Sequence, residues 1–247
     1  MTIIVIASGK GGVGKTSIAV NMAIMMSRLM PMQRVVLLDA DLGLANANLL
    51  MGIQPAYTTR NIEDGMTAEE IITERYGIGL IAGESGARQK TLESVRRMLR
   101  ACMDVAADVM VIDTSPGISD AMTEIISAGD HVIVVSTPEI TALTDSYQLL
   151  KYLIRSGKVE GELHLLMNKT GERDDGSSKA AAVTNLCRDY LGHKVDHLGS
   201  IRHSQAVEQA IMEQCPFAIA DPGSNAAHDI GDICQTIIEK RGENHGQ

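Results

Sequence analysis

The sequence predicts an α/β fold: one domain of three layers, in which a mostly parallel sheet of about seven strands carries helices on both faces. Three observations support this prediction. The 247 residues suit one domain with a sizeable core. Short apolar runs bounded by turn residues alternate with longer stretches of helical spacing. The content of 45% hydrophobic and 21% charged residues is that of an ordinary globular protein and excludes a disordered chain.

The apolar runs predict strands that are buried on both faces, because crossover helices cover both faces of a parallel sheet. These runs are residues 3–7, 34–39, 78–81, 109–113, 131–135, 164–167 and 197–201. Helical spacing fills most of the intervals, at residues 15–29, 92–106, 120–128, 143–156, 179–191, 204–213 and 225–240. The polar stretch 171–178 indicates an exposed connection rather than a boundary, so we expect residues 1–247 to form a single domain.

Composition and charge exclude several classes of function. The chain has 22 Lys and Arg against 31 Asp and Glu, and this net charge of −9 gives no general attraction to nucleic acid or anionic lipid. Aromatic residues make up 2%, so bases would find few stacking platforms. The N-terminus shows no basic segment of a signal peptide, and no apolar stretch reaches the roughly 20 residues of a membrane span. We therefore expect a cytoplasmic protein that touches a membrane only peripherally, if at all.

A glycine-rich segment follows the first predicted strand and precedes the first predicted helix. It fits the phosphate-binding pattern G-x-x-x-x-G-K-[ST] in the strand–helix context that this pattern requires, and it consists of Gly9, Lys10, Gly11, Gly12, Val13, Gly14, Lys15 and Thr16. Backbone N–H groups and the helix N-terminus would hold phosphate oxygens, Lys15 would neutralise the β- and γ-phosphates, and Thr16 would ligate Mg²⁺. The alternative is an ordinary glycine-rich turn. We expect Lys15→Ala to abolish nucleotide binding with little effect on folding.

Carboxylates stand where two further strands end. Asp39 and Asp41 follow the second apolar run, and Asp113 closes the run Val109–Met110–Val111–Ile112. Ligands of open parallel sheets bind at the carboxyl edge of the strands, where one carboxylate can hold a water of Mg²⁺ and another can position the attacking water. Asp113 at the end of four apolar residues has the pattern of a Walker B aspartate. An ordinary Asp-rich turn is the alternative for Asp39 and Asp41.

The segment from Lys10 to Ser17, Lys-Gly-Gly-Val-Gly-Lys-Thr-Ser, resembles the deviant Walker A motif of the MinD/ParA family. Members of this family are ATPases that sandwich two nucleotides in a head-to-head dimer. The resemblance implies that Lys10 reaches the partner's phosphates, Asp41 positions the nucleophilic water and Asp39 lies in the outer shell of the metal. It also implies that Asn168 contacts adenine, and Gly171 stands where a guanine-reading motif would carry Asp. ATP and Mg²⁺ are thus the expected ligands, whereas an exposed, non-functional Lys10 and a plain strand-end Asn168 are the alternatives.

Three longer stretches resemble the MinD branch and its flagellar relatives, the FlhG proteins that are also called FleN or YlxH. They are residues 39–52, residues 137–147, although Ile140 replaces a proline, and a closing segment made of residues 198–201, 206–207 and 216–217. Ser115 and Pro116 replace the Gly-Ala or Pro-Ala that relatives often carry. The resemblance implies a slowly hydrolysing, ATP-dependent homodimer that regulates the number or position of flagella, or the division site. Its partners would be a protein regulator or cargo, such as an FlhF-like GTPase or flagellar switch proteins.

Other functions are open at this point. A metal-centre or cofactor maturation ATPase of the same fold usually carries a cysteine pair; Cys102, Cys187, Cys215 and Cys234 form no such pair in sequence, although Cys102 could meet its symmetry mate at a dimer seam. A non-hydrolysing adaptor is disfavoured by the intact Lys15, Thr16 and three aspartates. A basic cluster predicts either a solvated helix face or a docking surface for an acidic partner, and consists of Arg88, Lys90, Arg96, Arg97 and Arg100.

An apolar stripe marks the last predicted helix. It consists of Ile230, Ile233, Cys234, Ile237 and Ile238. A membrane anchor would need basic flanks and bulky Trp, Phe or Leu. We therefore expect the stripe to pack against the domain.

Overall fold

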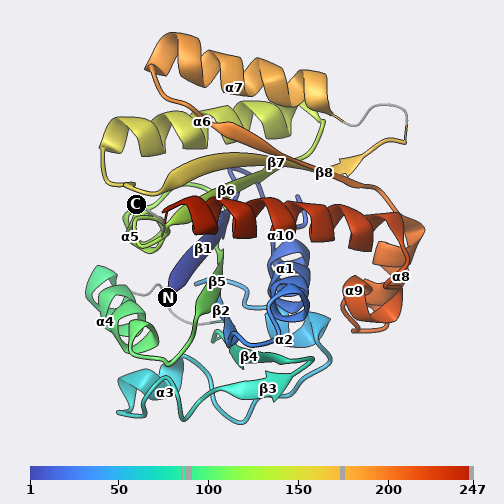
Figure 1. The fold of residues 1–247 in the computed structure, drawn as a ribbon. Helices are drawn as coiled ribbons and strands as arrows, with labels where there is room; N and C mark the ends of the chain where they lie inside the picture. Colours follow the sequence, from blue (N-terminus) through green and yellow to red (C-terminus); the bar gives the residue numbers. More distant parts are fainter. Residues whose placement is uncertain (85, 87–90, 173–175, 245–247) are drawn as a thin grey trace.

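Eight strands form one sheet in the computed structural model, which describes residues 1–84, 86, 91–172 and 176–244. Their spatial order is β3-β4-β2-β5-β1-β6-β7-β8 (Figure 1). The strands are β1 (Thr2–Ala7), β2 (Val35–Ala40), β3 (Thr73–Arg75), β4 (Ile78–Ile81), β5 (Val109–Thr114), β6 (His131–Ser136), β7 (Glu162–Thr170) and β8 (Asp196–Arg202). Every pair of neighbours is parallel except β3 and β4. The predicted fold class is confirmed.

Strand β3 is the eighth strand that the sequence prediction lacked. It pairs antiparallel with β4 through the two-residue turn Tyr76-Gly77, whose φ angles are 56° and 80°. Positive φ at both central residues is the mark of the hairpin turns that follow the twist of the flanking strands. Three residues, two of them exposed, give no apolar run, so hydrophobic periodicity could not reveal this strand.

All seven predicted helices are present, with ends shifted by a few residues. They are α1 (Lys15–Leu29), α4 (Leu92–Met103), α5 (Asp120–Ile126), α6 (Ile140–Ser156), α7 (Ser177–Leu191), α8 (Gln205–Met212) and α10 (Asn225–Asn244). Three four-residue helices were not predicted: α2 (Ala47–Leu50), α3 (Arg60–Glu63) and α9 (Phe217–Ala220). Because α7 begins at Ser177, the connection predicted for residues 171–178 is shorter than expected; residues 173–175 lie outside the described part of the chain.

The sheet is buried on both faces, and its side chains alternate between two apolar cores. Ile4 and Ile6 of β1 face the layer that contains α1 and α10, whereas Val5 and Ala7 face the layer of α4 to α7 (Figure 1). The apolar stripe of α10 is at most 2% exposed at Ile230, Ile233, Cys234 and Ile237 and lies in the first of these cores. The expectation that the stripe packs against the domain is confirmed. No helix among the described residues is both long and apolar enough to span a membrane.

The order of the strands determines where ligands can gather. β1 lies in the middle of the sheet, and its neighbours β5 and β6 run parallel to it on either side. The carboxyl ends of β1, β2, β5, β6 and β7 therefore meet along one edge. Loops that leave these ends in different directions open a crevice, which is the usual ligand site of such sheets.

Candidate functional site

The glycine-rich segment forms a loop between β1 and α1, at the floor of a cleft of about 920 Å³. Gly12 (φ 79°) and Gly14 (φ 92°) adopt the left-handed backbone conformation that glycine tolerates. Gly14 directly precedes the first turn of α1, so the loop delivers the chain to a helix N-terminus, which attracts anions. Of the predicted nucleotide-binding residues, the cleft is lined by Lys10, Gly11, Gly12, Val13, Gly14, Lys15, Thr16, Ser17 and Asn168.

Gly9 lies on the side of the loop that faces α6. A Cβ atom at this position would lie 2.3 Å from the backbone carbonyl oxygen of Asp145 in α6. Only glycine permits so close an approach. The start of the loop is thereby packed against α6, although Gly9 is not among the residues that line the cleft.

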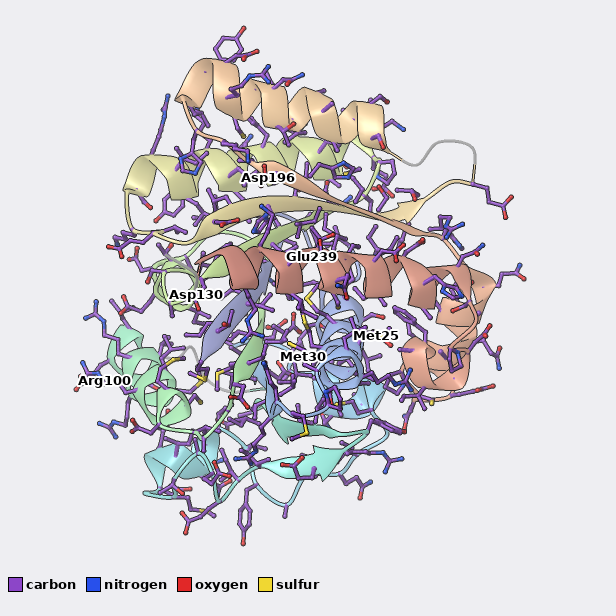
Figure 2. The ribbon with its side chains drawn as sticks, viewed as in Figure 1. Met25, Met30, Arg100, Asp130, Asp196 and Glu239 are labelled. Carbon is purple, nitrogen blue, oxygen red and sulfur yellow. The ribbon has the colours of Figure 1, made fainter. Side chains whose placement is uncertain are left out.

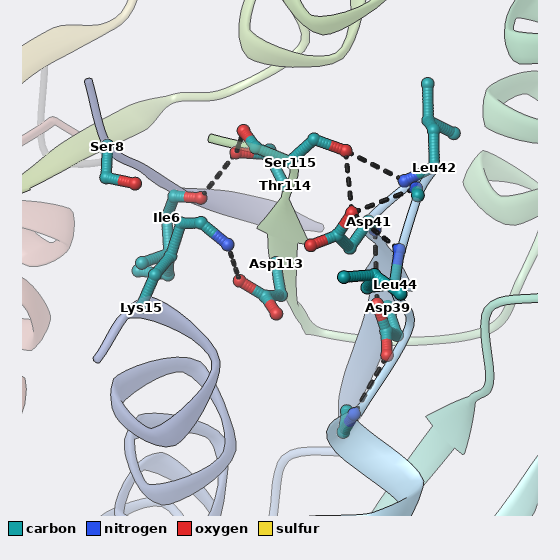
Figure 3. Close-up of polar contacts among 12 residues, drawn as sticks. Ile6, Ser8, Lys15, Asp39, Asp41, Leu42, Leu44, Asp113, Thr114 and Ser115 are labelled. Atoms are coloured by element: carbon teal, nitrogen blue, oxygen red, sulfur yellow. Dashed lines mark hydrogen bonds and ion pairs between the residues drawn. The ribbon is translucent and has the colours of Figure 1, made fainter. Parts of the chain in front are cut away.

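Lys15 forms a buried ion pair with Asp113 at the end of β5. Its Nζ atom lies 2.9 Å from Asp113 Oδ1, and the two side chains are 7% and 0% exposed (Figure 3). Burial raises the pKa of Asp113, while Lys15 and hydrogen bonding by Thr16 oppose that rise. Lys15, the predicted phosphate-binding cation, thus compensates a carboxylate of its own chain.

Asp39, at the end of β2, lies beside Asp113 in the register of the sheet. It is 1% exposed and accepts hydrogen bonds from the backbone N–H groups of Ala47 (2.9 Å) and Asp41 (3.1 Å). Burial, followed by the repulsion of Asp113, raises the pKa of Asp39 to about 7 in spite of these donors. Of these two adjacent buried carboxylates, Asp113 is paired with Lys15 and Asp39 is held by backbone N–H groups, so the site is short of positive charge.

Asp41 follows β2 and lines the cleft. Its Oδ1 atom accepts three hydrogen bonds: from the Ser115 hydroxyl (2.8 Å), from Gly43 N–H (3.0 Å) and from Leu44 N–H (3.2 Å). The Ser115 hydroxyl also accepts a hydrogen bond from Leu42 N–H at 2.9 Å (Figure 3). Ser115 therefore ties the loop after β2 to the loop after β5 and fixes the orientation of this carboxylate.

The donor set agrees with a Mg²⁺ ion bound together with a nucleotide. Asp113 Oδ2 is buried and has no hydrogen-bond partner in the structure, and such an atom needs an explanation by a ligand or ordered water. Thr16 stands half-buried at the cleft side of Asp113. Hydroxyl and carboxylate oxygens are ligands that Mg²⁺ prefers, often through water. Thr16, Asp39 and Asp113, the predicted metal residues, thus meet at the edge of the sheet, where the two aspartates lie behind the cleft wall.

Asn168 of β7 supports the phosphate loop directly. Its side-chain Nδ2 donates to the carbonyl oxygen of Val13 at 2.7 Å and lies against Gly14. The next residue, Lys169, has a φ of 57° and donates through Nζ to the carbonyl oxygen of Gly12 at 3.1 Å. Sequence reasoning missed this role of Lys169, because a positive φ at a non-glycine residue has no sequence pattern. The adenine contact expected of Asn168 stays a prediction.

Lys10 stands at the mouth of the cleft and is 40% exposed. Its Nζ atom lies 3.2 Å from Glu139 Oε2 and 3.3 Å from Thr141 Oγ1, at the start of α6. The contact with the exposed Glu139 is weak in water. Lys10 is therefore held within its own chain by an interaction that another anion can replace.

The remaining predicted features have mixed outcomes. Cys102 is fully buried in the core beneath α4, so the suggestion that it meets a symmetry mate at a dimer seam is wrong. Cys187 is buried in the same layer and Cys234 in the opposite one.

The basic cluster is partly neutralised within the chain. Arg96 donates two hydrogen bonds to the carboxylate of Glu124 in α5, of 2.8 and 3.1 Å. Arg88 and Lys90 lie outside the described residues. A docking role for the cluster stays a prediction.

A parallel α/β sheet with a phosphate loop after its central strand, and with carboxylates at the ends of the neighbouring strands, defines a P-loop nucleotide-binding protein. The family model described as "ParA: NUBPL iron-transfer P-loop NTPase" matches residues 1–238. The chain belongs to the ParA/MinD family of P-loop NTPases.

Relatives with known names agree with this family. "Antiactivator FleN" of Pseudomonas aeruginosa is 30% identical over 242 residues, which are 95% of this chain and 85% of FleN. "Flagellum site-determining protein YlxH" of Helicobacter pylori is 29% identical over 248 residues, 96% of this chain and 82% of YlxH. The structure of septum site-determining protein MinD complexed with Mg-ADP from Pyrococcus horikoshii superposes with a TM-score of 0.81 at 22% identity, covering 98% and 97% of the two chains. This last likeness concerns the fold.

Proposed function

We propose that this protein is an ATP-dependent dimerisation switch in which residues 1–247 act as one domain that binds ATP with Mg²⁺ and hydrolyses it slowly. The observation that carries the proposal is the arrangement of charge in the cleft. A phosphate loop with one buried lysine faces three aspartates at the ends of β2 and β5, and a second lysine stands exposed at the cleft mouth. Phosphates and a divalent cation together satisfy both sets of charges.

Nucleotide binding exchanges partners within this arrangement. Lys15 would move its ammonium from Asp113 to the β- and γ-phosphates. Asp113 and Asp39 would then hold Mg²⁺ through its water, and Thr16 would be a direct ligand. Mg²⁺ supplies the positive charge that neutralises the phosphates and the buried carboxylates. The loop from Gly11 to Ser17 holds the phosphate oxygens by its N–H groups, and Asn168 keeps the loop in place and faces adenine.

Hydrolysis depends on Asp41. We assign its carboxylate to the attacking water, because it lines the cleft beside the phosphate loop while Asp39 and Asp113 are buried behind it. Ser115 positions this carboxylate by the 2.8 Å hydrogen bond to Oδ1. Asp41 lies in the loop after β2 and Ser115 in the loop after β5. Turnover therefore responds to any partner that moves one of these loops against the other.

Lys10 makes the switch respond to the γ-phosphate. It is not needed to cradle phosphates in its own loop, and its exposed position at the cleft mouth lets it reach a nucleotide held by a second copy of the chain. We propose that Lys10 leaves Glu139 and bonds to the phosphates of the opposite subunit. Dimerisation then requires ATP in both clefts.

Light scattering with size exclusion tests the dimer. At protein concentrations well above micromolar, ATP with Mg²⁺ is expected to double the mass, and ADP is not. The Asp41→Ala variant should bind ATP and form a dimer that does not turn over, whereas Lys10→Ala should bind nucleotide as a monomer. An identical mass with both nucleotides would contradict the proposal.

A mixture of the two variants tests whether Lys10 acts in trans. In a heterodimer, one cleft combines its own intact Asp41 with an intact Lys10 from the opposite subunit. Turnover should therefore reappear on mixing, although each variant alone is inactive. If heterodimers form and no phosphate is released, Lys10 serves only its own loop.

The names of the relatives suggest what the switch controls. FleN is named an antiactivator and YlxH a flagellum site-determining protein, and several MinD sequences also match. We propose that this chain regulates the number or position of flagella or, as the second candidate, the division site. The partner would be a protein regulator or cargo, such as an FlhF-like GTPase or a flagellar switch protein, and the protein would act in the cytoplasm with transient contact at the membrane. Deletion of the gene followed by counting flagella and measuring cell lengths separates the two roles.

A further inference from the structure

Two buried histidines and a glutamate meet at the edge of the sheet opposite the nucleotide cleft. His131 is the first residue of β6, Glu162 is the first residue of β7, and His164 follows two residues later. The register pairs His131 with Glu162, so all three side chains leave the same face of the sheet, the face that α10 covers. His131 and His164 are 2% and 0% exposed, while the Glu162 side chain is 40% exposed. The cluster is thus buried at its base and reaches solvent through Glu162.

The spacing of the three side chains is that of metal ligands. His131 Nδ1 lies 3.2 Å from His164 Nε2, and His164 Nε2 lies 3.7 Å from Glu162 Oε2. One ligand atom from each residue falls within 4.8 Å of the other two. In a tetrahedral site with bonds of about 2.0–2.1 Å, ligand atoms stand roughly 3.3 Å apart. Small side-chain movements therefore suffice to close the three atoms around one ion.

A hydrogen-bonded pair of histidines does not fully account for the burial of these rings. Among the described residues, the buried His164 Nδ1 atom has no hydrogen-bond partner, and an unsatisfied buried nitrogen costs stability. The polar contacts of this ring are made by Nε2, the atom that would bind the ion. Burial lowers the pKa of His131 and lowers that of His164 to about 4. Burial thus favours the neutral imidazole, which is the form that binds metal.

We propose that His131, Glu162 and His164 bind a divalent transition metal ion of the Zn²⁺ type. Two imidazole nitrogens with one carboxylate oxygen suit Zn²⁺ and its neighbours, whereas Mg²⁺ and Ca²⁺ prefer oxygen ligands. The ion would tie β6 to β7 beneath α10 and would stabilise the folded chain, because the unfolded chain lacks the assembled site. This proposal is independent of the nucleotide cleft.

Lys240 of α10 competes with the ion for Glu162. Its Nζ atom lies 3.3 Å from Glu162 Oε2 and 2.9 Å from Asp196 Oδ2. When the metal takes Glu162, Lys240 keeps its contact with Asp196. Figure 2 shows Asp196 and Asp130 on either side of the C-terminal half of α10, so carboxylates balance the helix's own Lys240 and Arg241 near the cluster. Removing the Lys240 charge should therefore strengthen metal binding.

Titration of EDTA-treated, nucleotide-free protein with Zn²⁺ by calorimetry, in excess Mg²⁺ to occupy oxygen sites, tests the proposal. We expect one ion per chain with a dissociation constant of about micromolar or below, a tetrahedral absorption spectrum with Co²⁺, and a higher melting temperature with Zn²⁺. Glu162→Gln and His164→Ala should weaken binding at least about tenfold. His228→Ala, which removes an exposed histidine of α10, should bind as wild type does.

Lys240→Met is expected to strengthen Zn²⁺ binding, whereas Glu162→Gln and His164→Ala weaken it. Like Glu162→Gln, it leaves both buried histidines in place, so these two variants test the proposal even if His164→Ala does not fold. Tighter Zn²⁺ binding by Lys240→Met supports the proposal, and equal or weaker binding contradicts it. No binding at micromolar Zn²⁺, or binding that Glu162→Gln leaves unchanged, overturns it, the latter by showing an adventitious site elsewhere.

Discussion

Replacing Lys15 by methionine should destabilise the ligand-free protein, in addition to abolishing nucleotide binding. Methionine fills a similar volume but removes the ammonium that lies 2.9 Å from Asp113 Oδ1. Asp113 is fully buried, and its Oδ2 atom already lacks a hydrogen-bond partner in the part of the chain that the structure describes. The variant must therefore either bury an unpaired carboxylate or protonate it. The buried ion pair thus replaces the expectation from the sequence that a substitution of Lys15 has little effect on folding.

Both routes lead to a similar loss of stability. Removing one partner of a buried ion pair costs about 3–5 kcal/mol. The loss of stability cannot exceed the free energy needed to protonate Asp113. For a carboxyl group of ordinary pKa, near 3.9, protonation at pH 7 costs about 4 kcal/mol, at 1.36 kcal/mol per pH unit. Burial raises the pKa of Asp113 even in the wild type, so part of this cost is already present. We therefore expect a loss of about 3 kcal/mol in the free energy of unfolding.

The dependence on pH follows from the sign of the shift. In the variant the folded-state pKa of Asp113 lies above its unfolded value, so the loss grows as pH rises above about 4 and levels off above the folded-state pKa. At pH 5 the cost of protonating Asp113 falls to about 1.5 kcal/mol. Urea unfolding at pH 7 and pH 5 measures the difference. A loss below about 1 kcal/mol at pH 7, or one that does not shrink at pH 5, would refute the reasoning.

Two further variants complete this experiment. Lys15→Met combined with Asp113→Asn removes the buried charge and should recover most of the stability, because breaking a pair costs more than replacing both partners. Lys169→Met is the matched control. It removes an exposed lysine of the same cleft whose Nζ donates to the carbonyl oxygen of Gly12 and, among the described residues, has no carboxylate partner. It should change stability by no more than about 0.5 kcal/mol.

Three other predictions concern the same cleft. Ser115→Ala should lower kcat about tenfold with little change in KM, because it removes a hydrogen bond to the Asp41 carboxylate; phosphate release measures this, and full activity of the variant would contradict the positioning role. Gly9→Ala should cost about 1–3 kcal/mol in thermal unfolding, since its Cβ would meet the Asp145 backbone, whereas Gly11→Ala, with Pro116 Cγ 3.9 Å away, should be tolerated in the ligand-free protein. Because the folded-state pKa of Asp39 is raised to about 7, the ligand-free wild type should lose about 1.4 kcal/mol more than Asp39→Asn between pH 6 and pH 8 in urea unfolding; equal pH profiles would show that Asp39 does not titrate there.

The sequence predicted the parts of the fold that depend on local pattern. Residues 78–81 and residues 15–29 coincide with β4 and α1, because a continuous apolar run and a glycine-bounded helix are both marked by neighbouring residues. Strand β3 depends instead on the turn at Tyr76 and Gly77, where a tyrosine adopts a positive φ. Tyr76 adopts this conformation because it allows β3 to pair with β4. The hydrophobic pattern of the sequence carries no sign of it.

For the site, residue identities were predictable and their partners were not. Spacing by two residues placed Asp39 and Asp41 together, but only the structure shows that β2 ends at Ala40, so that Asp39 turns inward while Asp41 faces the cleft. The ion pair between Lys15 and Asp113 joins residues 98 positions apart. Contacts of this kind depend on which strands become neighbours and on the exclusion of water, neither of which a motif records.

The electrostatics of the ligand-free cleft explain why an anion site carries so many acids. Asp39 and Asp113 lie side by side in the sheet, nearly without solvent, and Lys15 is bonded to only one of them. Burial and the repulsion of Asp113 raise the pKa of Asp39 to about 7, so the negative charge of Asp39 is poorly stabilised by the protein alone. A nucleotide without a metal would draw Lys15 away from Asp113 and increase the excess of negative charge in the cleft. A nucleotide with a divalent cation would instead neutralise that excess. In the proposed function these acids would therefore make phosphate binding and metal binding interdependent, as a switch that responds to the Mg²⁺ complex of ATP requires.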